Sequence, residues 1–332
     1  MIKCAIVGAT GIVGQTFLKV LEEKRLKIDE YELFASSKSN GKKVKFMNKE
    51  YTVQELTEES FEKGKFNYAL FSAGGSISKQ YIPLAVKTGC IVIDNSSYFR
   101  MHDDVPLVVP EVNEEDIFKN TGIIANPNCS TIQAMLPLKA LNDKYTISRI
   151  VYSTYQAVSG AGNGGINDLV NTRNGSGPNK FPYNITDNCI PHIDIFLENN
   201  YTREEMKMIE ESRKILHNPN LRITATCVRV PILNCHSESI NVEFENEFDI
   251  QDIFTTLSNY PGIIVVDQIQ NNKYPINELA NGIDEVLVGR IRRDYSVKNG
   301  INLWVVADNV RKGAASNAVQ ILEKLLEKRR DI

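Results

Sequence analysis

Short apolar runs alternate with helical patterns over the first 130 residues. The runs lie at 3–8, 31–35, 68–72, 90–94, 107–109 and 122–125. Apolar residues recur at helical spacing after the first run, at Val13, Phe17, Leu18 and Leu21, and again around 77–88 and from 130 to 141. Nearly continuous apolar strands separated by helices are typical of a parallel sheet that is covered on both faces. We therefore predict an α/β domain here.

The pattern changes from about Thr146, where longer strand candidates follow one another. They lie at 147–158, 222–232, 236–245, 262–269, 286–294 and 303–309. In the third, His236, Ile240, Val242 and Phe244 share one parity, with mostly polar residues between them. Such alternation predicts a sheet with one face that is either wet or turned toward another subunit.

The C-terminal stretch 310–329 is helical by its pattern. Ala314, Ala318, Ile321, Leu322 and Leu325 fall on one side of that helix. A helix with one apolar stripe needs a partner, and we expect this one to pack on the first domain. The predicted domains are 1–128 with 309–332, and 129–308. The first is a Rossmann-type parallel sheet and the second an α+β domain.

Composition narrows the class of protein. A chain of 332 residues exceeds the usual size of a single core, and its net charge of −3 gives no push toward nucleic acid or a membrane surface. We expect neither a signal peptide nor a membrane span, because the first residues lack the leader pattern and no segment approaches 18 consecutive apolar residues. The six cysteines are scattered without a C-x-x-C pair, which predicts free thiols in the cytoplasm, most of them small core residues.

A glycine loop follows the first strand. Gly8, Gly11 and Gly14 form a G-x-x-G-x-x-G variant of the dinucleotide fingerprint between that strand and the first helix. Glycines there let backbone N–H groups and the helix start approach a pyrophosphate. We predict a nucleotide site that includes Thr10, Ile12 and Val13. The alternative is a tight strand–helix turn without a ligand.

The end of the second strand bears on which nucleotide binds. An NAD site usually carries Asp or Glu there to hold the ribose 2′-hydroxyl, whereas this chain has Ser36, Ser37, Lys38 and Ser39. Hydroxyls and an ammonium attract a 2′-phosphate that a carboxylate would repel, so the sequence favours NADP. The alternative is that 36–43 is a solvated loop that binds nothing.

Cys129 stands where an apolar run meets a helical pattern, in "NPNCSTIQ". An apolar row of Ile132, Met135 and Leu136 follows it. Free N–H groups and the macrodipole at a helix start stabilise a thiolate and lower a thiol pKa. A cysteine taken alone is more often an inert core residue, but the neighbouring nucleotide loop favours a nucleophile.

Eight blocks spread over the whole chain resemble one family, the bacterial aspartate-β-semialdehyde dehydrogenases. They are "GATGIVG" (8–14), "DNSSYFR" (94–100), "NPNCST" (126–131), "YQAVSGAG" (155–162), "NCIPHID" (188–194), "EEMK" (204–207), "CVRVPILNCHSES" (227–239) and "ADNVRKGAASNAVQI" (307–321). The compact region 163–203 resembles the Gram-positive-type branch. Glyceraldehyde-3-phosphate dehydrogenases and N-acetyl-glutamyl-phosphate reductases share the architecture but differ at the cysteine.

The resemblance implies an activity. Members of this family reduce β-aspartyl phosphate to aspartate semialdehyde with NADPH and release phosphate, in the biosynthesis of lysine, threonine and methionine. The family's nucleophile falls on Cys129, whose thioester a hydride can reduce. The acid/base residue falls on His236, which would take the thiol proton and later protonate the developing oxygen. Gln156 would orient substrate and thioester.

The resemblance also implies how substrate and cofactor are held. Arg229 matches the residue that binds the α-carboxylate, Glu204 the residue that pairs with the amine, and Arg100 and Lys207 the phosphate site. Ser159, Gly160 and Asn309 match positions beside the nicotinamide. The family implies no metal, and it implies a homodimer formed through the sheet of the second domain.

The residues by themselves leave alternatives open. Glu204 and Lys207, spaced i,i+3, also fit a surface salt bridge, and the glycine-rich 159–165 fits a flexible connector. Lys38 replaces an arginine found in many relatives, and Cys235 replaces a glycine or alanine, which suggests packing. His102 and His217 are expected to be structural, and His192 receives no chemical role. Other functions that fit are a related acyl-phosphate or acyl-thioester reductase, or a nucleotide-binding sensor without catalysis.

Overall fold

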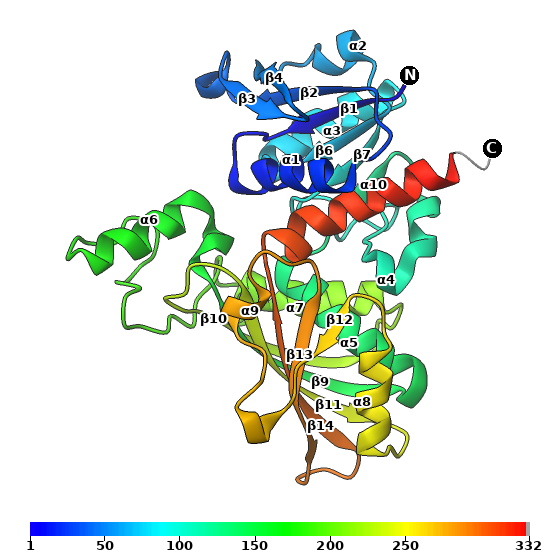
Figure 1. The fold of residues 1–332 in the computed structure, drawn as a ribbon, viewed down its shortest axis with the longest axis vertical. Coiled ribbons are helices and arrows are strands. Elements are labelled where there is room, and N and C mark those ends of the chain that lie inside the picture. Colours follow the sequence, from blue (N-terminus) through cyan, green and yellow to red (C-terminus); the bar gives the residue numbers. More distant parts are fainter. Residues whose placement is uncertain (330–332) are drawn as a thin grey trace. The chain divides into compact units, whose positions relative to one another are not determined.

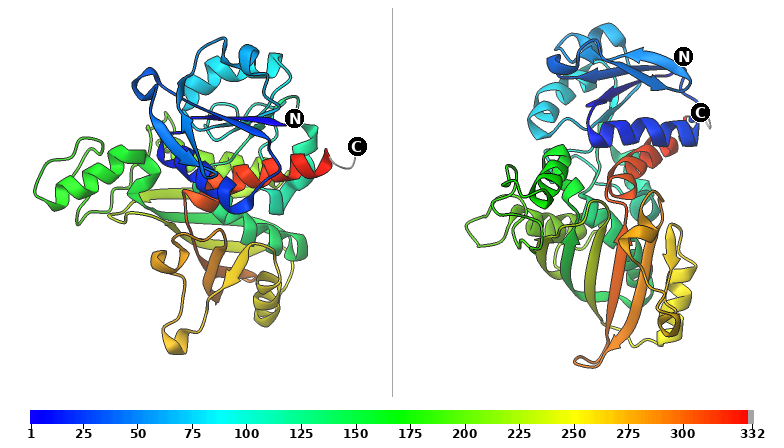
Figure 2. Two further views of the ribbon diagram at one scale, coloured as in Figure 1. Left: turned by 45° about the horizontal axis from the view of Figure 1, so that its top comes forward. Right: turned by 60° about the vertical axis from the view of Figure 1, so that its left-hand side comes forward.

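The structure is a computed structural model that describes residues 1–329. It divides into two compact units (Figures 1 and 2). The first comprises Met1–Pro127 and the described residues from Ala314 onward, and the second comprises Asn128–Gly313. The sequence predicted that the second domain ends at residue 308. In the structure, residues 309–313 also belong to the second unit. The last three residues of the predicted first domain, 330–332, lie outside the described residues.

A six-stranded parallel sheet forms the centre of the first unit, in the order β5-β2-β1-β6-β7-β8. Its strands are β1 (Lys3–Val7), β2 (Glu30–Ala35), β5 (Gln54–Glu55), β6 (Tyr68–Phe71), β7 (Ile91–Asp94) and β8 (Ile123–Ala125). The β6 residues are all buried, as expected of a strand covered on both faces. The predicted parallel α/β domain is confirmed.

The helices of the first unit follow the predicted pattern. They are α1 (Ile12–Lys24), α2 (Ser60–Gly64), α3 (Gly75–Lys87), α4 (Pro110–Asn113) and α10 (Asn317–Lys328), with 3-10 turns η1 (Ser37–Ser39) and η2 (Glu114–Lys119). Helix α10 lies beside α1 (Figures 1 and 2). Its residues Ala318, Ile321, Leu322 and Leu325 join the core of this unit, which confirms the predicted packing. A π-helical segment, η5 (Arg311–Ser316), precedes α10.

One predicted strand is wrong. Residues 107–109 form no strand, and only Leu107 makes an isolated bridge, to Ala125. Pro106 and Pro110 flank the run, and a proline cannot donate to a ladder, so the chain turns into α4 instead. The sequence also gave no sign of the small hairpin of β3 (Lys43–Phe46) and β4 (Lys49–Thr52).

The second unit contains a six-stranded mixed sheet in the order β10-β9-β11-β14-β13-β12. Its strands are β9 (Ile147–Gln156), β10 (Arg222–Arg229), β11 (His236–Phe244), β12 (Ile263–Val265), β13 (Val286–Asp294) and β14 (Gly300–Ala307). Strands β9 and β10 are parallel, whereas β11 runs antiparallel to β9 and β14. Strand β12 is shorter than the predicted 262–269.

Most helices of the second unit pack on one face of this sheet, while one short helix packs on the other face, where Ala280 joins Leu287, Val306 and Trp304. Those of the second unit are α5 (Cys129–Tyr145), α6 (Gly162–Arg173), α7 (Arg203–Ile215), α8 (Ile250–Ser258) and α9 (Asn277–Ala280), with 3-10 turns η3 (Val158–Ala161) and η4 (Ile269–Asn271). Helix α5 packs against β9, β11 and β14, and α7 packs against β10. On β11, Ile240, Val242 and Phe244 are buried, while Asn241 and Glu243 are partly exposed. The predicted alternation is confirmed.

No helix within residues 1–329 is both long and apolar enough to cross a membrane.

Candidate active site

Cys129 is the first residue of α5, as the sequence predicted. The apolar row behind it is buried and anchors the helix, and Pro137 lies within the helix without shifting its start. Asn128 precedes the helix, and its main-chain N–H donates to Glu211 Oε2 at 2.7 Å. The Cys129 Sγ atom lies 3.6 Å from Asn128 Oδ1. The thiol therefore sits at a fixed helix start, where free N–H groups stabilise a thiolate.

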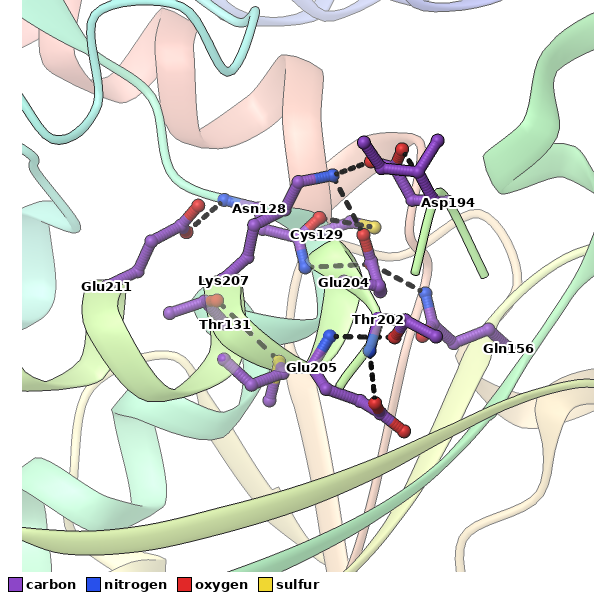
Figure 3. Close-up of polar contacts among 12 residues, drawn as sticks. Asn128, Cys129, Thr131, Gln156, Asp194, Thr202, Glu204, Glu205, Lys207 and Glu211 are labelled. Atoms are coloured by element: carbon purple, nitrogen blue, oxygen red, sulfur yellow. Dashed lines mark hydrogen bonds and ion pairs between the residues drawn. The ribbon is translucent and has the colours of Figure 1, made fainter. Parts of the chain in front are cut away.

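Three donors converge on the buried carboxylate of Glu204, on α7 (Figure 3). Asn128 Nδ2 and Gln156 Nε2 donate to its Oε1 atom at 2.9 and 3.1 Å, and Lys207 Nζ lies 3.0 Å from its Oε2 atom. Burial by itself raises the pKa of the Glu204 carboxyl, but the charge of Lys207 and the three hydrogen bonds lower it to about 2. Glu204 thus carries a fixed negative charge, and Asn128 links it to the Cys129 thiol.

Lys207 bridges two carboxylates, since its Nζ atom also lies 2.9 Å from Asp194 Oδ2. The pair with Glu204 is not a surface salt bridge, because Glu204 is buried. The neighbouring Glu205 has a different role. It forms a capping box with Thr202 and accepts from the N–H of Cys227, so it holds the start of α7. The two neighbouring glutamates therefore have different roles: Glu204 pairs with Lys207, and Glu205 caps α7.

His236 begins β11 and is fully buried. Its Nδ1 atom accepts from the main-chain N–H of Ala157 at 3.0 Å. Its Nε2 atom is buried without a hydrogen-bond partner among the described residues. Burial, together with the positive charge of Arg229, lowers the pKa of His236 to about 3. The imidazole is therefore neutral at physiological pH.

Arg229 ends β10, directly beside Gln156 in the parallel ladder with β9. The guanidinium is buried; its Nη1 atom donates to the carbonyl of Ala157 at 2.6 Å, while Nε has no partner among the described residues. Burial lowers the pKa of Arg229, while the nearby groups Glu204 and Cys129 act to raise it. Arg229 thus lies within electrostatic reach of Glu204, His236 and Cys129.

Gly160 brings its backbone against two of these groups. A Cβ atom there would lie 3.0 Å from Arg229 Nη1 and 3.1 Å from His236 Nε2. We therefore expect Gly160→Ala to lower kcat/KM by about 10- to 100-fold, because a small displacement of reacting groups carries such a penalty. Gly177→Ala is the matched control, since nothing lies within 4 Å of its Cβ position. Equal activity of the two variants, at unchanged thermal stability, would contradict this prediction.

Ser159 and Asn309 form one network. Asn309 Nδ2 donates to Ser159 Oγ at 3.0 Å, and Asn309 Oδ1 accepts from the N–H of Cys235 at 2.9 Å. Cys235 is buried among apolar side chains, as its predicted packing role requires. This network holds the backbone of Cys235, the residue before His236, in place. The contact of Ser159, Gly160 and Asn309 with a nicotinamide stays a prediction.

The glycine loop of the first unit fits a dinucleotide. Gly8 has a φ of 85°, and a Cβ there would lie 2.2 Å from the carbonyl oxygen of Ser72. A Cβ at Gly14 would lie 2.0 Å from the oxygen of Gly8. These two glycines are thus required by the tight turn and by the close packing of helix on strand that a dinucleotide loop needs. A cavity of about 410 Å³ adjoins the loop and is lined by Gly8, Thr10 and Gly11, among others.

Only two of the four residues predicted at the end of the second strand line that cavity. Ser36 and Ser37 line it, whereas Lys38 is exposed and Ser39 is buried with its Oγ 3.3 Å from Thr10 Oγ1. Ile12 and Val13 begin α1, and neither lines the cavity. Glu55 of β5 does line it. A carboxylate therefore stands near this edge after all, supplied by a different strand from the one where sequence reasoning looked for it.

Arg100 is buried in the first unit. Its Nε atom donates to the carbonyl of Asn126 at 2.9 Å and its Nη2 atom to the carbonyl of Asn95 at 3.0 Å. These bonds fix the guanidinium on the turn that ends at Pro127. Its place in a phosphate site, together with Lys207, stays a prediction.

Sequence reasoning missed several residues of the site. Asn128 contacts Glu204, Asp194 holds Lys207, and Ala157 contacts both His236 and Arg229 through its backbone. A Cβ at Gly313 would lie 2.9 Å from the Cβ of Cys129. Asn128 and Asp194 lie within sequence blocks that resemble the family, and this location was a signal that could have identified them. A main-chain contact such as that of Ala157 leaves no sequence signal.

The remaining cysteines and histidines show no site of their own. Cys4, Cys90, Cys227 and Cys235 are buried, and burial raises the pKa of each thiol. His192 stacks on Phe196 with ring centroids 4.3 Å apart, and His102 contacts the rings of Tyr98 and Phe99. Within residues 1–329 no group of three or more His, Cys, Asp or Glu side chains could hold a metal.

Glu238 is a buried carboxyl two residues beyond His236, and neither of its oxygens has a hydrogen-bond partner among the described residues. Burial, and then the charge of Glu204, raises the pKa of Glu238 in the folded protein. The folded state therefore holds a proton that the unfolded state loses above about pH 4.3, so stability falls as pH rises.

We expect Glu238→Gln to remove this dependence. Between pH 5 and 8 the wild type should lose stability relative to the variant, by up to about 1.4 kcal/mol per pH unit. Urea unfolding of both proteins at pH 5, 6, 7 and 8 measures the difference in their free energies of unfolding. The contributions of the other titrating groups are the same in both proteins and cancel in this difference. A stability difference that does not change with pH would show that Glu238 is ionised in the folded protein.

Comparisons with known proteins place the chain among relatives over its whole length. Residues 3–120 match the family described as "Semialdehyde dehydrogenase, NAD binding domain", and residues 138–312 match "Semialdehyde dehydrogenase, dimerisation domain". The chain is 54% identical to an aspartate-semialdehyde dehydrogenase of Aquifex aeolicus, over 98% of each chain.

Solved structures agree with this. An aspartate semialdehyde dehydrogenase II from Vibrio cholerae, complexed with ASA, matches with a TM-score of 0.94 at 46% identity and 98% coverage of both chains. An aspartate semialdehyde dehydrogenase with NADP from Candida albicans matches with a TM-score of 0.78 at 27% identity, again over 98% of both chains.

Proposed function

The chain belongs to the aspartate-semialdehyde dehydrogenase family, and we propose that it reduces L-aspartyl-4-phosphate to L-aspartate-4-semialdehyde through a thioester on Cys129. The observation that carries the proposal is the grouping of a thiol at a helix start with Glu204, Arg229 and His236. Phosphate is released and the reaction is reversible. NADPH, when bound, supplies the hydride.

Cys129 attacks the acyl carbon of the acyl phosphate, and phosphate leaves as the thioester forms. The start of α5 stabilises the attacking thiolate. The amide of Gln156 is held between the hydroxyl of Thr154 and the carboxylate of Glu204, at 3.0 and 3.1 Å, so its orientation is fixed before substrate arrives. It orients the acyl group, and His236 is the acid/base residue that takes the thiol proton and later protonates the developing oxygen.

The charges of the site match those of an amino-acid substrate. Arg229 presents a planar guanidinium to the α-carboxylate, and Glu204 presents a permanently ionised carboxylate to the ammonium. Lys207 and Arg100 bind the phosphate. These assignments favour an amino acid over the acyl groups of a different reductase, and the grouping of reactive residues speaks against a sensor without catalysis.

NADP is the proposed cofactor, because Ser36 and Ser37 line the cavity beside the glycine loop and the end of β2 carries no carboxylate. Lys38→Ala should raise the KM for NADP by about tenfold, since a charge-assisted contact to the 2′-phosphate is lost. The KM for NAD should not change. Lys42→Ala, an exposed lysine of the same loop, is the control. An equal change for both cofactors would mean that Lys38 does not read the 2′-phosphate.

We propose a homodimer formed through the sheet face that lies opposite α5. That face carries the partly exposed rings of Tyr155 and Trp304, with centroids 5.5 Å apart. The dimerisation-domain match covers these strands. The free cysteines favour a reducing compartment, and we propose the cytoplasm. Light scattering on purified protein tests the dimer, and a monomer at micromolar concentration would contradict it.

The direct test of the activity is an assay in the reverse direction. Aspartate semialdehyde, phosphate and NADP should give NADPH, and omission of phosphate should stop the reaction. A panel of other aldehydes distinguishes an aspartate-semialdehyde dehydrogenase from a related reductase. No phosphate-dependent reduction of NADP with any of them would sink the proposed activity.

A further inference from the structure

We propose that two buried amides, those of Asn126 and Asn317, position Arg100 for phosphate, so that helix α10 helps to set the affinity for this substrate. The two asparagines are positioning residues, because they act through the guanidinium of Arg100. The phosphate role of Arg100 rests on the proposed function, whereas the contacts among the three side chains do not.

Arg100 is oriented by two main-chain carbonyls at the carboxyl edge of the parallel sheet. Its Nε atom donates to the carbonyl of Asn126 at 2.9 Å, and its Nη2 atom donates to the carbonyl of Asn95 at 3.0 Å. These two residues directly follow β8 and β7, which are neighbours in the sheet. A guanidinium is a planar fork, so the placement of the two carbonyls determines where its other N–H groups point.

The side chain of Asn126 joins the residues that supply those carbonyls. Its Nδ2 atom donates to Asn95 Oδ1 at 2.7 Å. The main-chain N–H of Asn126 donates to the carbonyl of Asp94 at 2.8 Å, which continues the pairing of β7 with β8 past the strand ends. The position of the Asn126 amide therefore determines where the Arg100 guanidinium lies.

Helix α10 and the segment before it hold that amide from the other side. The Asn126 Nδ2 atom also donates to the carbonyl of Ala314 at 3.1 Å, and its Oδ1 atom accepts from Asn317 Nδ2 at 2.7 Å. Asn317 Nδ2 donates in addition to the carbonyl of Val108 at 2.9 Å. Because a carbonyl can only accept, one orientation of the Asn126 amide satisfies Ala314 and Asn317 together.

Packing by itself does not require this network. Asn126 and Asn317 are fully buried, and their hydrogen bonds do little more than offset the loss of hydration. Ile321 and Leu322 already anchor α10 in the apolar core of the first unit. A buried network in which every group is satisfied specifies one geometry, and a guanidinium that binds an anion needs a fixed direction.

The phosphate affinity of Asn317→Leu tests the proposal. Leucine is close to asparagine in shape but donates no hydrogen bond, so Asn126 Oδ1 loses its donor. We expect the Kd of inorganic phosphate, measured by titration calorimetry on the intact protein, to rise by about fivefold to tenfold, because a displaced guanidinium makes weaker charge-assisted hydrogen bonds. In the reverse reaction the KM for phosphate should rise similarly, while those for aspartate semialdehyde and NADP change by less than about twofold.

A double-mutant cycle separates positioning from a general loss of stability. Arg100→Gln removes the guanidinium and should raise the Kd of phosphate by about 10- to 100-fold. Without the guanidinium, Asn317→Leu should have no further effect, so the double variant should match Arg100→Gln. The matched control is Gln320→Ala. It removes another polar contact of α10, from Gln320 Nε2 to Glu111 Oε1 at 3.0 Å, and should leave the Kd unchanged.

An unchanged Kd in Asn317→Leu, or an equal effect of this substitution with and without Arg100, would overturn the inference. If Asn317→Leu does not fold, Asn126→Ser removes the same contact from the other side and must raise the Kd. If the wild type binds phosphate but shows no phosphate-dependent turnover, the proposed activity fails, and the binding data still decide the role of the asparagines. A wild type that binds no phosphate, with or without NADP, would refute both.

Discussion

Replacing Cys129 by alanine should lower kcat for the phosphate-dependent reaction by about 10,000-fold or more. No other thiol can substitute for it, because the thioester must form at the start of α5, beside Asn128 and within reach of Arg229. The assay is the rate of NADPH formation from aspartate semialdehyde, phosphate and NADP. Activity near the wild-type rate would exclude the thioester mechanism.

The control is Cys189→Ala, which removes the exposed cysteine. It should leave the rate unchanged. Iodoacetate labelling provides a second readout that requires no substrate. Cys129 should be alkylated faster than Cys189 despite its lower exposure, because the helix start keeps it as a thiolate. Faster labelling of Cys189 would mean that exposure alone sets the rate.

Replacing Arg229 by leucine should raise the KM for aspartate semialdehyde by about 100-fold or more. The buried guanidinium provides charge-assisted hydrogen bonds to the α-carboxylate, each worth about 1.5–3 kcal/mol. The substitution also leaves the carbonyl of Ala157 without its donor, so a smaller fall in kcat should accompany it. Steady-state kinetics over a wide range of substrate concentration separates the two effects.

Two comparisons make the Arg229 result specific. Arg222→Leu alters an exposed arginine at the other end of β10 and should leave the KM unchanged. Arg229→Lys keeps the charge but loses the planar fork, so its KM should lie between those of the wild type and the leucine variant. An unchanged KM in Arg229→Leu would refute the carboxylate role.

Local patterns were enough to predict most of the elements. The strands and helices of the first unit recur close to their predicted positions, because parallel strands buried on both faces require apolar runs. The apolar run at 107–109 was wrongly predicted to be a strand. The prolines on either side prevent the ladder of hydrogen bonds that its hydrophobicity suggested. The division of the chain was predicted to within a few residues, but residues 309–313 stay with the second unit.

The sequence by itself determined the family and the nucleotide loop, and it predicted the reactive side chains, because residue type and order carry that information. It could not say that Glu204 is buried and ionised, that Glu205 is only a helix cap, or that Glu55 lines the nucleotide cavity. Those properties depend on which strands become neighbours.

The tertiary structure alone decided the state of the site. Cys129 and His236 are far apart in the sequence, and both come within electrostatic reach of Arg229 only because α5 packs on β11 while β9 pairs with β10 and β11. The same pairing brings a peptide N–H against His236 Nδ1. Every residue except proline carries the same backbone groups, so no sequence pattern encodes that contact.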